Sequence, residues 1–383
     1  MTSLQHKSVA LYFSNVNHYS LLDLVLRCLK ILDCEVRLFL AEGLTQDVYK
    51  TSGILSSQII SNRNFPSRDI FKAFNASDFV IIDELYSFRE LSSFSVYPLR
   101  RPNIFLIHDC NSWLAPSSPQ GIVQKLKYLM TRRVAKKVGY YGVAGENMQN
   151  YCKNELGAKN VTLIPFRYAD FNPSVDLPDE FYKQGTPIRM VVPGMLSRRR
   201  NYLELLKAVC REELKGKVEL ILLGKPDGEH GHEIISRARE LSNQGYSVRY
   251  WSHFIPNDVF DAEIKNAHIL FSYFETTYPT NNGQLEVYGV SKETGIASLM
   301  LNKAKVGLLP NEFNQMETIK CQTLTYKSMN DLAGILASIY DGTIDVGPKI
   351  SRAVSNAESM DLMHIVRNLD ESYKEQIADF SKK

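Results

Sequence analysis

The second half of the sequence contains a basic turn directly after a strand-like run. Residues 187–193 are mostly apolar, Gly194 follows, and three arginines precede a helical pattern that begins at residue 201: Arg198, Arg199 and Arg200. Guanidinium groups beside a helix N-terminus suit an anion such as a diphosphate, because the helix amides and the cations attract the same charge. A solvated basic turn accounts for the same residues equally well from charge alone.

A second strand end nearby has the same character. The apolar run 220–223 leads into Gly224 and Lys225. Two cationic strand ends in one domain favour anion binding over a solvated turn.

A third segment, residues 286–295, combines carboxylates, a cation and a helix start. Ser291 can cap the following helix, so that its first amides point at a phosphate, and Lys292 adds positive charge. Glu286 and Glu293 can accept hydrogen bonds from ribose or sugar hydroxyls. A loop with solvated charges is the alternative for this segment taken alone.

The elements that must position these residues alternate along the chain. Most strand-like runs are continuously apolar, which is typical of parallel strands covered on both faces. The runs are 8–14, 35–40, 78–83, 103–107, 138–143, 161–165, 187–193, 218–224, 247–251, 268–272, 305–310 and 322–326. Helical periods lie at 19–32, 201–213, 262–267, 294–302, 331–340 and 361–380. The rhythm predicts an α/β protein with doubly wound parallel sheets.

The rhythm breaks once, in a proline-containing acidic stretch near the middle of the chain. We therefore expect two Rossmann-like, doubly wound parallel-sheet domains facing a central cleft. The expected parts are an N-terminal Rossmann-like domain at 1–170, a linker at 171–186, a C-terminal Rossmann-like domain at 187–349, and a C-terminal helical segment at 350–383 that crosses back to the first domain.

Composition and missing motifs exclude several classes of protein. The 45 Lys+Arg against 42 Asp+Glu give a net charge of +3, too balanced for a nucleic-acid-coating protein. No GxGxxG follows the first strand, and neither a phosphate-binding P-loop nor an Asp-x-Asp occurs. The six scattered cysteines predict reduced buried thiols rather than a disulfide framework. His230 and His232 are expected in a solvated turn, not in a metal site.

In their order and spacing, the three segments resemble the C-terminal domain of the retaining glycosyltransferases of the large fourth family, which have the GT-B fold. That family holds its nucleotide sugar with a G-x-L-S-x-x-[KR]-N helix entry, an L-x-x-G strand end and a Glu-x-Phe-Gly loop. Residues 251–256 and 266–270 resemble the family's passage into its final strands. In the first half, residues 104–109 resemble the strand that ends in a donor-facing histidine, here His108.

The resemblance implies the roles of the two domains and of the site residues. Residues 1–170 would be the acceptor domain, and residues 187–349 would be the nucleotide-sugar-binding domain. Arg200 and Lys225 would stabilise charge on the departing diphosphate, His108 would face the donor sugar, and Glu286 would contact the sugar hydroxyls. This catalytic set is supported by a donor-binding set of Gly194, Arg198, Glu275, Gly289, Val290, Ser291, Lys292 and Glu293. Glu293 would bind the ribose. Without the family context, a histidine after an apolar strand is more often a satisfied core residue.

The sequence also departs from the family. Met195 stands where an arginine is usual, and Glu286 and Glu293 are one position closer together than the usual glutamate pair. Glu275 therefore competes with Glu286 for the role of first glutamate. The N-terminal glycine-rich loop is replaced by residues 14–18.

The expected activity is transfer of a sugar from a UDP- or GDP-linked donor to the hydroxyl of a glycan or lipid-linked acceptor. By resemblance it proceeds with retention, without a metal or other cofactor, in the assembly of surface polysaccharide, glycolipid or glycoconjugate. A GT-B-shaped sugar-nucleotide epimerase or hydrolase is one alternative, but it needs a carboxylate pair that the sequence does not place. A non-catalytic nucleotide-sugar-binding protein is the other, because of Met195 and the glutamate spacing.

One basic stretch bears on location. Residues 124–137 contain six Lys or Arg and no acid, with Leu126, Leu129, Met130 and Val134 expected on roughly one face. Such a helix can lie on an anionic bilayer, or it can pack by its apolar face with a solvated basic side. With a polar N-terminus and no apolar run long enough to span a membrane, the expected location is cytoplasmic, with peripheral contact to the inner membrane face.

Overall fold

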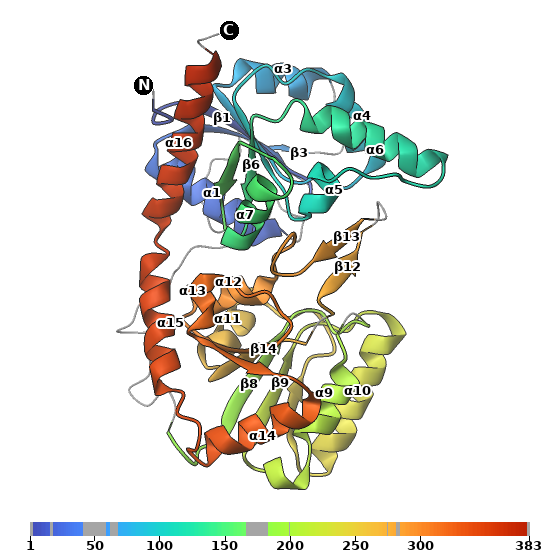
Figure 1. The fold of residues 1–383 in the computed structure, drawn as a ribbon, viewed down its shortest axis with the longest axis vertical. Helices are drawn as coiled ribbons and strands as arrows, with labels where there is room; N and C mark the ends of the chain where they lie inside the picture. The colour runs from blue at the N-terminus through green and yellow to red at the C-terminus, as the bar shows by residue number, and fades with distance from the viewer. Residues whose placement is uncertain are drawn as a thin grey trace. The chain divides into compact units, whose positions relative to one another are not determined.

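The computed structural model describes residues 3–15, 18–40, 59–61, 68–165, 183–198, 200–273, 275–280 and 284–380. The chain forms two compact units (Figure 1). Unit 1 comprises Met1–Tyr168, Thr277–Glu293 and Asp361–Lys383, and unit 2 comprises Ala169–Thr276 and Thr294–Met360. Most of the expected linker, residues 171–182, lies outside the described residues.

Unit 1 is built on a seven-stranded sheet in which every neighbouring pair is parallel. The strand order is β3-β2-β1-β4-β5-β6-β7, and it reverses between β1 and β4. The strands are β1 (Ser8–Phe13), β2 (Glu35–Leu40), β3 (Ile59–Ser61), β4 (Phe79–Ile82), β5 (Asn103–Leu106), β6 (Tyr140–Val143) and β7 (Val161–Leu163).

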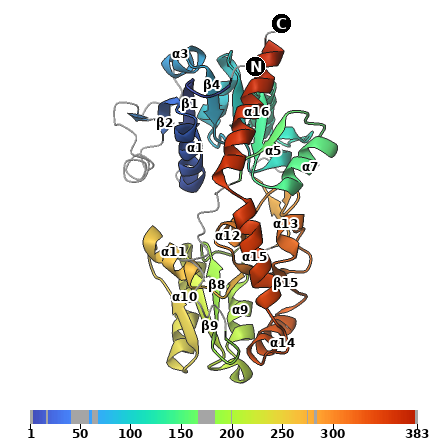
Figure 2. The same ribbon diagram turned by 90° about the vertical axis from the view of Figure 1, so that its left-hand side faces the viewer.

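Alternate residues of these strands pack on opposite faces of the sheet, because successive side chains of a strand point to opposite sides. Val9, Leu11 and Phe13 belong to one buried cluster, whereas Ala10 and Tyr12 belong to another. The first cluster is completed by α1 (Tyr19–Ile31) and α16 (Leu362–Phe380), which Figure 2 shows. The second is completed by α3 (Arg68–Ala76), α4 (Phe88–Val96), α6 (Ile122–Ala135) and α7 (Glu146–Asn154).

The chain's last helix is fastened to unit 1 by polar contacts as well as by packing. The amide of Asn103 donates to Gln376 Oε1 at 2.8 Å, and Asn368 Nδ2 donates to the carbonyl of Leu163 at 3.0 Å. Asp370 Oδ1 accepts from the amide of Leu4 at 2.7 Å. Among the described residues, no helix has both the length and the apolar composition needed to cross a bilayer.

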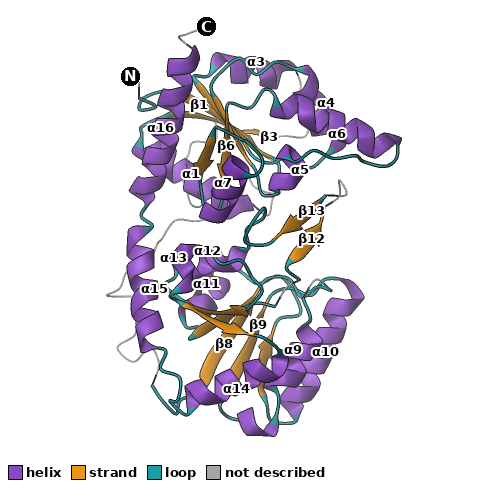
Figure 3. Cartoon of the chain, viewed as in Figure 1, coloured by secondary structure: helices purple, strands orange, loops and turns teal. Residues whose placement is uncertain are grey.

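Unit 2 repeats the pattern with a six-stranded parallel sheet in the order β10-β9-β8-β11-β14-β15, which reverses between β8 and β11. Its strands are β8 (Ile188–Pro193), β9 (Val218–Leu223), β10 (Ser247–Tyr250), β11 (Ile269–Phe271), β14 (Val306–Pro310) and β15 (Thr323–Tyr326). Helices cover this sheet (Figure 3): α9 (Tyr202–Val209), α10 (Gly228–Asn243), α11 (Asn257–Lys265), α12 (Gly295–Asn302), α13 (Glu317–Lys320), α14 (Met329–Tyr340) and α15 (Gly347–Ser359).

The predicted fold class, two Rossmann-like doubly wound sheets, is confirmed, and each predicted strand run contains a strand. The antiparallel hairpin of β12 (Thr277–Pro279) and β13 (Leu285–Val287) was not predicted, and it packs in unit 1 although it follows β11 of unit 2 in the chain. The prediction of a turn at His230 and His232 was wrong, because both lie in α10, where His230 Nδ1 lies 3.1 Å from Glu233 Oε2.

Two glycines allow the loops after β8 and β9 to touch by their backbones. A Cβ on Gly224 would lie 1.9 Å from the carbonyl oxygen of Gly194, and Gly194 itself has a φ of +108°, which favours glycine. The amide of Gly194 donates to the carbonyl of Leu223 at 3.0 Å. The main chains at these two strand ends therefore form one tightly packed edge.

We predict that Gly224→Ala lowers the free energy of unfolding by about 1–3 kcal/mol, because backbone atoms cannot move aside for the new methyl group. Gly334→Ala is the control: Gly334 lies on the exposed side of α14, and nothing lies within 4 Å of the place that a methyl group would take. Removing a helical glycine there should raise stability by about 0.5–1 kcal/mol. Urea unfolding of both variants measures the difference, and equal stabilities would contradict the close approach.

Candidate functional site

Polar side chains gather at the carboxyl end of the sheet of unit 1. His18 follows β1, Asp83 and Glu84 follow β4 directly, and His108 and Asp109 follow β5. β1 and β4 are the strands between which the order reverses, and β5 is the next neighbour of β4. Because open α/β sheets bind ligands at this edge and at this reversal, these residues form the candidate site of unit 1.

The carboxylate of Asp83 lies between two imidazole rings. Asp83 is fully buried, its Oδ2 lies 2.7 Å from His18 Nδ1, and its Oδ1 lies 3.2 Å from His108 Nε2. The two ring centroids are 4.1 Å apart. Asn15 Nδ2 lies 3.2 Å from His18 Nε2. Since an amide nitrogen only donates, His18 Nε2 accepts this bond, and the ring proton sits on Nδ1 and is donated to Asp83.

The charges of Asp83 and His108 follow from burial and hydrogen bonding. Burial by itself raises the pKa of Asp83, but the hydrogen bonds from His108 and His18 outweigh it, and the pKa lies below its usual value. Burial lowers the pKa of His108, and the neighbouring His18 lowers it further. Asp83 is therefore an anion at neutral pH, and His108 is a neutral imidazole whose Nε2–H donates to it and whose Nδ1 is an acceptor.

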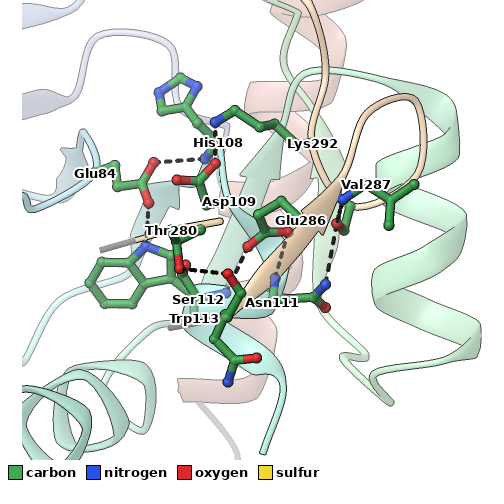
Figure 4. A network of polar contacts seen from close by, with 12 residues as sticks. Glu84, His108, Asp109, Asn111, Ser112, Trp113, Thr280, Glu286, Val287 and Lys292 are labelled. Carbon is green, nitrogen blue, oxygen red and sulfur yellow. Dashed lines mark hydrogen bonds and ion pairs between the residues drawn. The ribbon is translucent and has the colours of Figure 1, made fainter. Parts of the chain in front are cut away.

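Glu84, the next residue, has the opposite tendency. Glu84 Oε1 accepts from Trp113 Nε1 at 2.6 Å, and Glu84 Oε2 accepts from the amide of His108 at 3.0 Å (Figure 4). Complete burial, with the charge of Asp109, raises the pKa of Glu84 to about 8. At neutral pH, Asp83 is therefore ionised and Glu84 is protonated. A pair of carboxyl groups in different protonation states can supply both a base and an acid for proton transfer.

His18, Asp83 and His108 also form a group that could hold a metal ion. Within the part of the chain that the structure describes, their ligand atoms all lie within 4.8 Å of one another. Two imidazoles and a carboxylate are a ligand set used by zinc and by non-haem iron. Each imidazole nevertheless has hydrogen-bond geometry to a different oxygen of Asp83. The expectation that no metal is needed remains a prediction.

Lys292 lies at the same edge through its contact with Asp109. Its ammonium group forms an ion pair with Asp109 Oδ1 and lies 5.0 Å from the centroid of the Tyr278 ring. Burial alone would lower the pKa of Lys292, but the charge and hydrogen bond of Asp109 outweigh it and the pKa is raised. Lys292 is therefore positively charged in unit 1, and its predicted contact with a diphosphate stays a prediction.

Glu286, in strand β13, caps the short helix α5 (Cys110–Leu114). Its carboxylate accepts from the amides of Asn111 and Ser112, at 3.2 and 2.9 Å (Figure 4). Glu286 is fully buried, and burial raises its pKa. Asn111 Nδ2 also donates to the carbonyl of Leu285 at 2.9 Å. These bonds give Glu286 a structural role, holding the hairpin of β12 and β13 to unit 1.

The loop after the hairpin differs from the prediction in one respect. Helix α12 begins at Gly295 with Thr294 as its N-cap, so the prediction that Ser291 caps this helix was wrong. Ser291 Oγ instead accepts from the amide of Val287 at 2.8 Å, and the amide of Cys110 donates to the carbonyl of Ser291 at 2.9 Å. Ser291 lies four residues before the first residue of α12, whereas Thr294 directly precedes it. Thr294 is therefore the residue whose side chain accepts from a first-turn amide of the helix.

The other predicted residues of this loop also form contacts within unit 1. The carbonyl of Gly289 accepts from Asn147 Nδ2 at 2.8 Å, and the amide of Val290 donates to the carbonyl of Val287 at 3.1 Å. Glu293 is buried, 5% exposed. Their predicted contacts with the donor are not tested by these bonds.

In unit 2, the predicted basic residues lie at the carboxyl ends of β8 and β9. The guanidinium of Arg200 lies across Gly194 and donates to the carbonyl of Pro193. Arg198 and Lys225 are exposed, and no ion pair holds either of them among the described residues. Arg199 lies outside the described residues. The two exposed cations are therefore available to an anion at this edge.

Glu275 and a cavity occupy the neighbouring strand ends of unit 2. Glu275 follows β11 and is exposed, in contrast to the buried Glu286. A cavity of about 450 Å³ opens at the carboxyl ends of β11, β14 and β15, with Tyr273, Pro310 and Tyr326 in its wall. Asn201 and Glu204 at the start of α9 also line it, but none of the predicted site residues does.

Sequence reasoning placed His108 at this edge but missed its partners. His18, Asp83, Glu84 and Asp109 carry no motif of their own. A usable signal existed, because Asp83 was the last residue of a predicted strand and parallel strands bring their carboxyl ends together. The reversal of strand order between β1 and β4 is what joins His18 to Asp83, and the sequence does not state that order.

Solved structures of other proteins have a fold similar to that of this chain. No protein-family model matches the sequence, and no curated protein matches it. Among solved structures, HepE of Anabaena in complex with UDP aligns with a TM-score of 0.67 at 13% identity over 96% of this chain and 100% of that one. The sucrose-phosphate synthase of Thermosynechococcus elongatus aligns with a TM-score of 0.62 at 13% identity over 97% of this chain and 100% of that one.

A third solved structure, a glycosyltransferase from Rickettsia africae, aligns with a TM-score of 0.59 at 14% identity over 97% of this chain and 99% of that one. At such identities the likeness is one of fold. The chain has the two-unit α/β architecture of these proteins, the GT-B fold.

We predict that the protonation of Glu84 makes stability depend on pH. A carboxyl group whose pKa is raised on folding stabilises the protein below its unfolded-state pKa, and this contribution is lost as the pH rises through about 8. The melting temperature of the wild type should therefore fall between pH about 6 and about 9.

Glu84→Gln cannot ionise, so its melting temperature should change less over the same range, although its amide loses the bond from the His108 N–H and the variant is less stable overall. Glu229→Gln, at an exposed position of α10, is the control for the loss of one charge. Parallel pH profiles for the wild type and Glu84→Gln would refute the assignment of a protonated Glu84.

Proposed function

We propose that this chain is a glycosyltransferase that moves a sugar from a nucleotide-diphosphate donor to an acceptor hydroxyl. Two things support the proposal: the fold, and the charged groups at the carboxyl edge of each sheet. HepE, which has the same fold, has been solved with UDP and with UDP-glucose. A UDP-linked sugar is therefore the first donor to test, with GDP-linked sugars second.

The observation that carries the proposal is the edge formed by β8 and β9. The glycine pair lets the main chains at these two strand ends pack against each other, so that both basic turns belong to one edge. Exposed Arg198 and Lys225 flank it, and Arg200 lies across Gly194. A departing diphosphate gains negative charge in the transition state, and fixed cations stabilise that charge more than they stabilise the bound donor.

Between the two candidate glutamates, we assign the contact with the donor sugar to Glu275. Glu286 already accepts two amide hydrogen bonds at the start of α5 and is fully buried. Glu275 is exposed and closely follows β11, next to the point where the strand order of unit 2 reverses. Carboxylates that are open to solvent can accept hydrogen bonds from sugar hydroxyls.

We assign the sugar-facing role in unit 1 to His108. Asp83 fixes the orientation of its ring by accepting from Nε2, and burial keeps the imidazole neutral by lowering its pKa. Such a group can accept a hydrogen bond from a sugar hydroxyl. Retention, independence from metals, and a place in surface polysaccharide, glycolipid or glycoconjugate assembly belong to the same proposal, as does a cytoplasmic location.

A thermal-shift experiment tests the donor site. UDP, GDP and their sugars should raise the melting temperature of the wild type if they bind the folded protein. Lys225→Ala should weaken binding of the diphosphate about 10- to 100-fold, because a charge-assisted hydrogen bond is lost. Since Lys225 is exposed, the variant should melt at nearly the same temperature without ligand.

Arg237→Ala is the matched control, since Arg237 is a half-exposed cation on α10 that pairs with Glu240. If no nucleoside diphosphate stabilises the wild type, or if both variants weaken binding equally, the assignment of the donor site fails.

A turnover assay separates the proposal from its alternatives. A glycosyltransferase consumes donor only when an acceptor is supplied, apart from slow hydrolysis. Conversion of the donor alone to an epimer or to free sugar would indicate an epimerase or hydrolase that uses the Asp83 and Glu84 carboxyl groups. Binding without consumption of donor, over a panel of glycan and lipid acceptors, would indicate a non-catalytic binding protein.

A further inference from the structure

Helix α6 carries apolar residues on two sides, and only one side is packed. Met130 and Val134 are buried, 5% and 1% exposed, in the same cluster as α4 and α7. Leu126 and Leu129 are exposed, at 45% and 57%. The sequence placed all four on roughly one face, but only Met130 and Val134 are packed against unit 1. The packed side centres on Thr131 and Val134, Leu129 is turned away from it, and Leu126 lies at its border, closer to the free end of the helix.

The outward side of α6 forms a continuous stripe. Ile122, Leu126 and Leu129 follow one another at helical spacing, so they lie on the same face. Ile122 is 85% exposed, and the adjoining Val123 is 63% exposed. Figure 1 shows α6 projecting from unit 1 beyond α4. Ile122, Val123 and Leu126 belong to the first half of this helix, and Leu129 lies at its middle.

This concentration of exposed apolar residues is unusual. Single exposed apolar residues are ordinary on a protein surface, whereas a cluster marks an interaction site. Of the twelve large hydrophobic side chains that the described residues expose, four lie within eight consecutive positions of this one helix. Exposure is greatest at the N-terminal end, where the helix is least covered by unit 1.

The charges around the stripe indicate what covers it. The segment from Ile122 to Lys136 contains no Asp or Glu. Arg132 turns inward and donates to the carbonyl of Leu114 at 2.9 Å, but Lys125, Arg133 and Lys136 are exposed, and among the described residues no carboxylate forms an ion pair with them. Arg133 and Lys136 continue the outer side of the helix beyond Leu129, and Lys125 borders the stripe.

A bilayer with anionic headgroups matches this surface better than a protein does. Apolar side chains flanked by lysine and arginine allow a helix to lie in the interface, with the apolar residues among the acyl chains and the cations among the phosphates. A second copy of this chain would bring two acid-free basic surfaces together, and like charges across an interface are repulsive.

We propose that the outer face of α6 docks this protein on an anionic membrane surface. This face consists of Ile122, Lys125, Leu126, Leu129, Arg133 and Lys136. Binding to the membrane does not depend on the proposed enzymatic function. Only its use does: on a membrane surface, a glycosyltransferase would meet a lipid-linked acceptor.

Co-sedimentation of the full chain with vesicles tests the proposal. The wild type should sediment with vesicles of phosphatidylcholine mixed with phosphatidylserine and remain in solution with phosphatidylcholine alone. Leu126→Ser combined with Leu129→Ser should weaken binding to the anionic vesicles at least about tenfold, because two apolar side chains no longer enter the interface. Lys125→Gln combined with Arg133→Gln should reduce binding and remove much of its salt dependence.

Val96→Ser is the matched control, because Val96 is 69% exposed on α4 of the same unit. It should bind vesicles as the wild type does. All these positions are exposed, and circular dichroism with thermal melting verifies that each variant is folded.

The proposal is overturned if the wild type does not sediment with anionic vesicles, or if the serine double variant binds them as well as the wild type does. It is also overturned if the wild type is a dimer in solution and the serine double variant is a monomer, because a second copy then covers the face. A thermal shift with UDP, measured on the same samples, keeps a failure of the donor site separate from a failure of membrane docking.

Discussion

A parallel strand that is covered on both faces has no place for a polar side chain along its length. In both sheets of this protein, the strand interiors are almost wholly apolar, and charged or polar groups appear where the strands end. This constraint moves the chemistry to the carboxyl edges. It places Asp83, Glu84 and His108 at one edge and Gly194, Arg200 and Lys225 at the other, whatever ligands the two units bind.

The consecutive residues Asp83 and Glu84 show that the neighbours of a buried carboxyl group decide whether its pKa is raised or lowered. Both carboxyl groups are buried, and burial favours the neutral form of each. Asp83 has two imidazoles that can donate to it, and these bonds favour its anion. Glu84 has the indole of Trp113 and one amide, but also the negative charge of Asp109 nearby, and its pKa is raised. Adjacent residues of the same chemical type therefore have different protonation states.

The hairpin of β12 and β13, with the loop after it, shows that one local pattern is compatible with more than one set of contacts. Glu286, Ser291 and Lys292 have the residue types of an anion or sugar site, and each forms a contact within unit 1: to the amides of α5, to the amide of Val287, and to Asp109. A carboxylate near helix amides satisfies the same physical rule whether the amides belong to its own segment or to a distant one. Only the path of the chain distinguishes the two.

The sequence by itself determined most of the strands, the two-sheet α/β class and the position of the basic turn, because apolar runs, glycines and charge clusters are local properties. It could not determine strand order, and so it could not bring His18 to Asp83, since that contact depends on which strands become neighbours. The same holds for α6: its composition was readable, but which apolar residues face the core depends on where the sheet and α4 lie. Tertiary structure alone decided that Met130 and Val134 are buried while Leu126 and Leu129 face solvent.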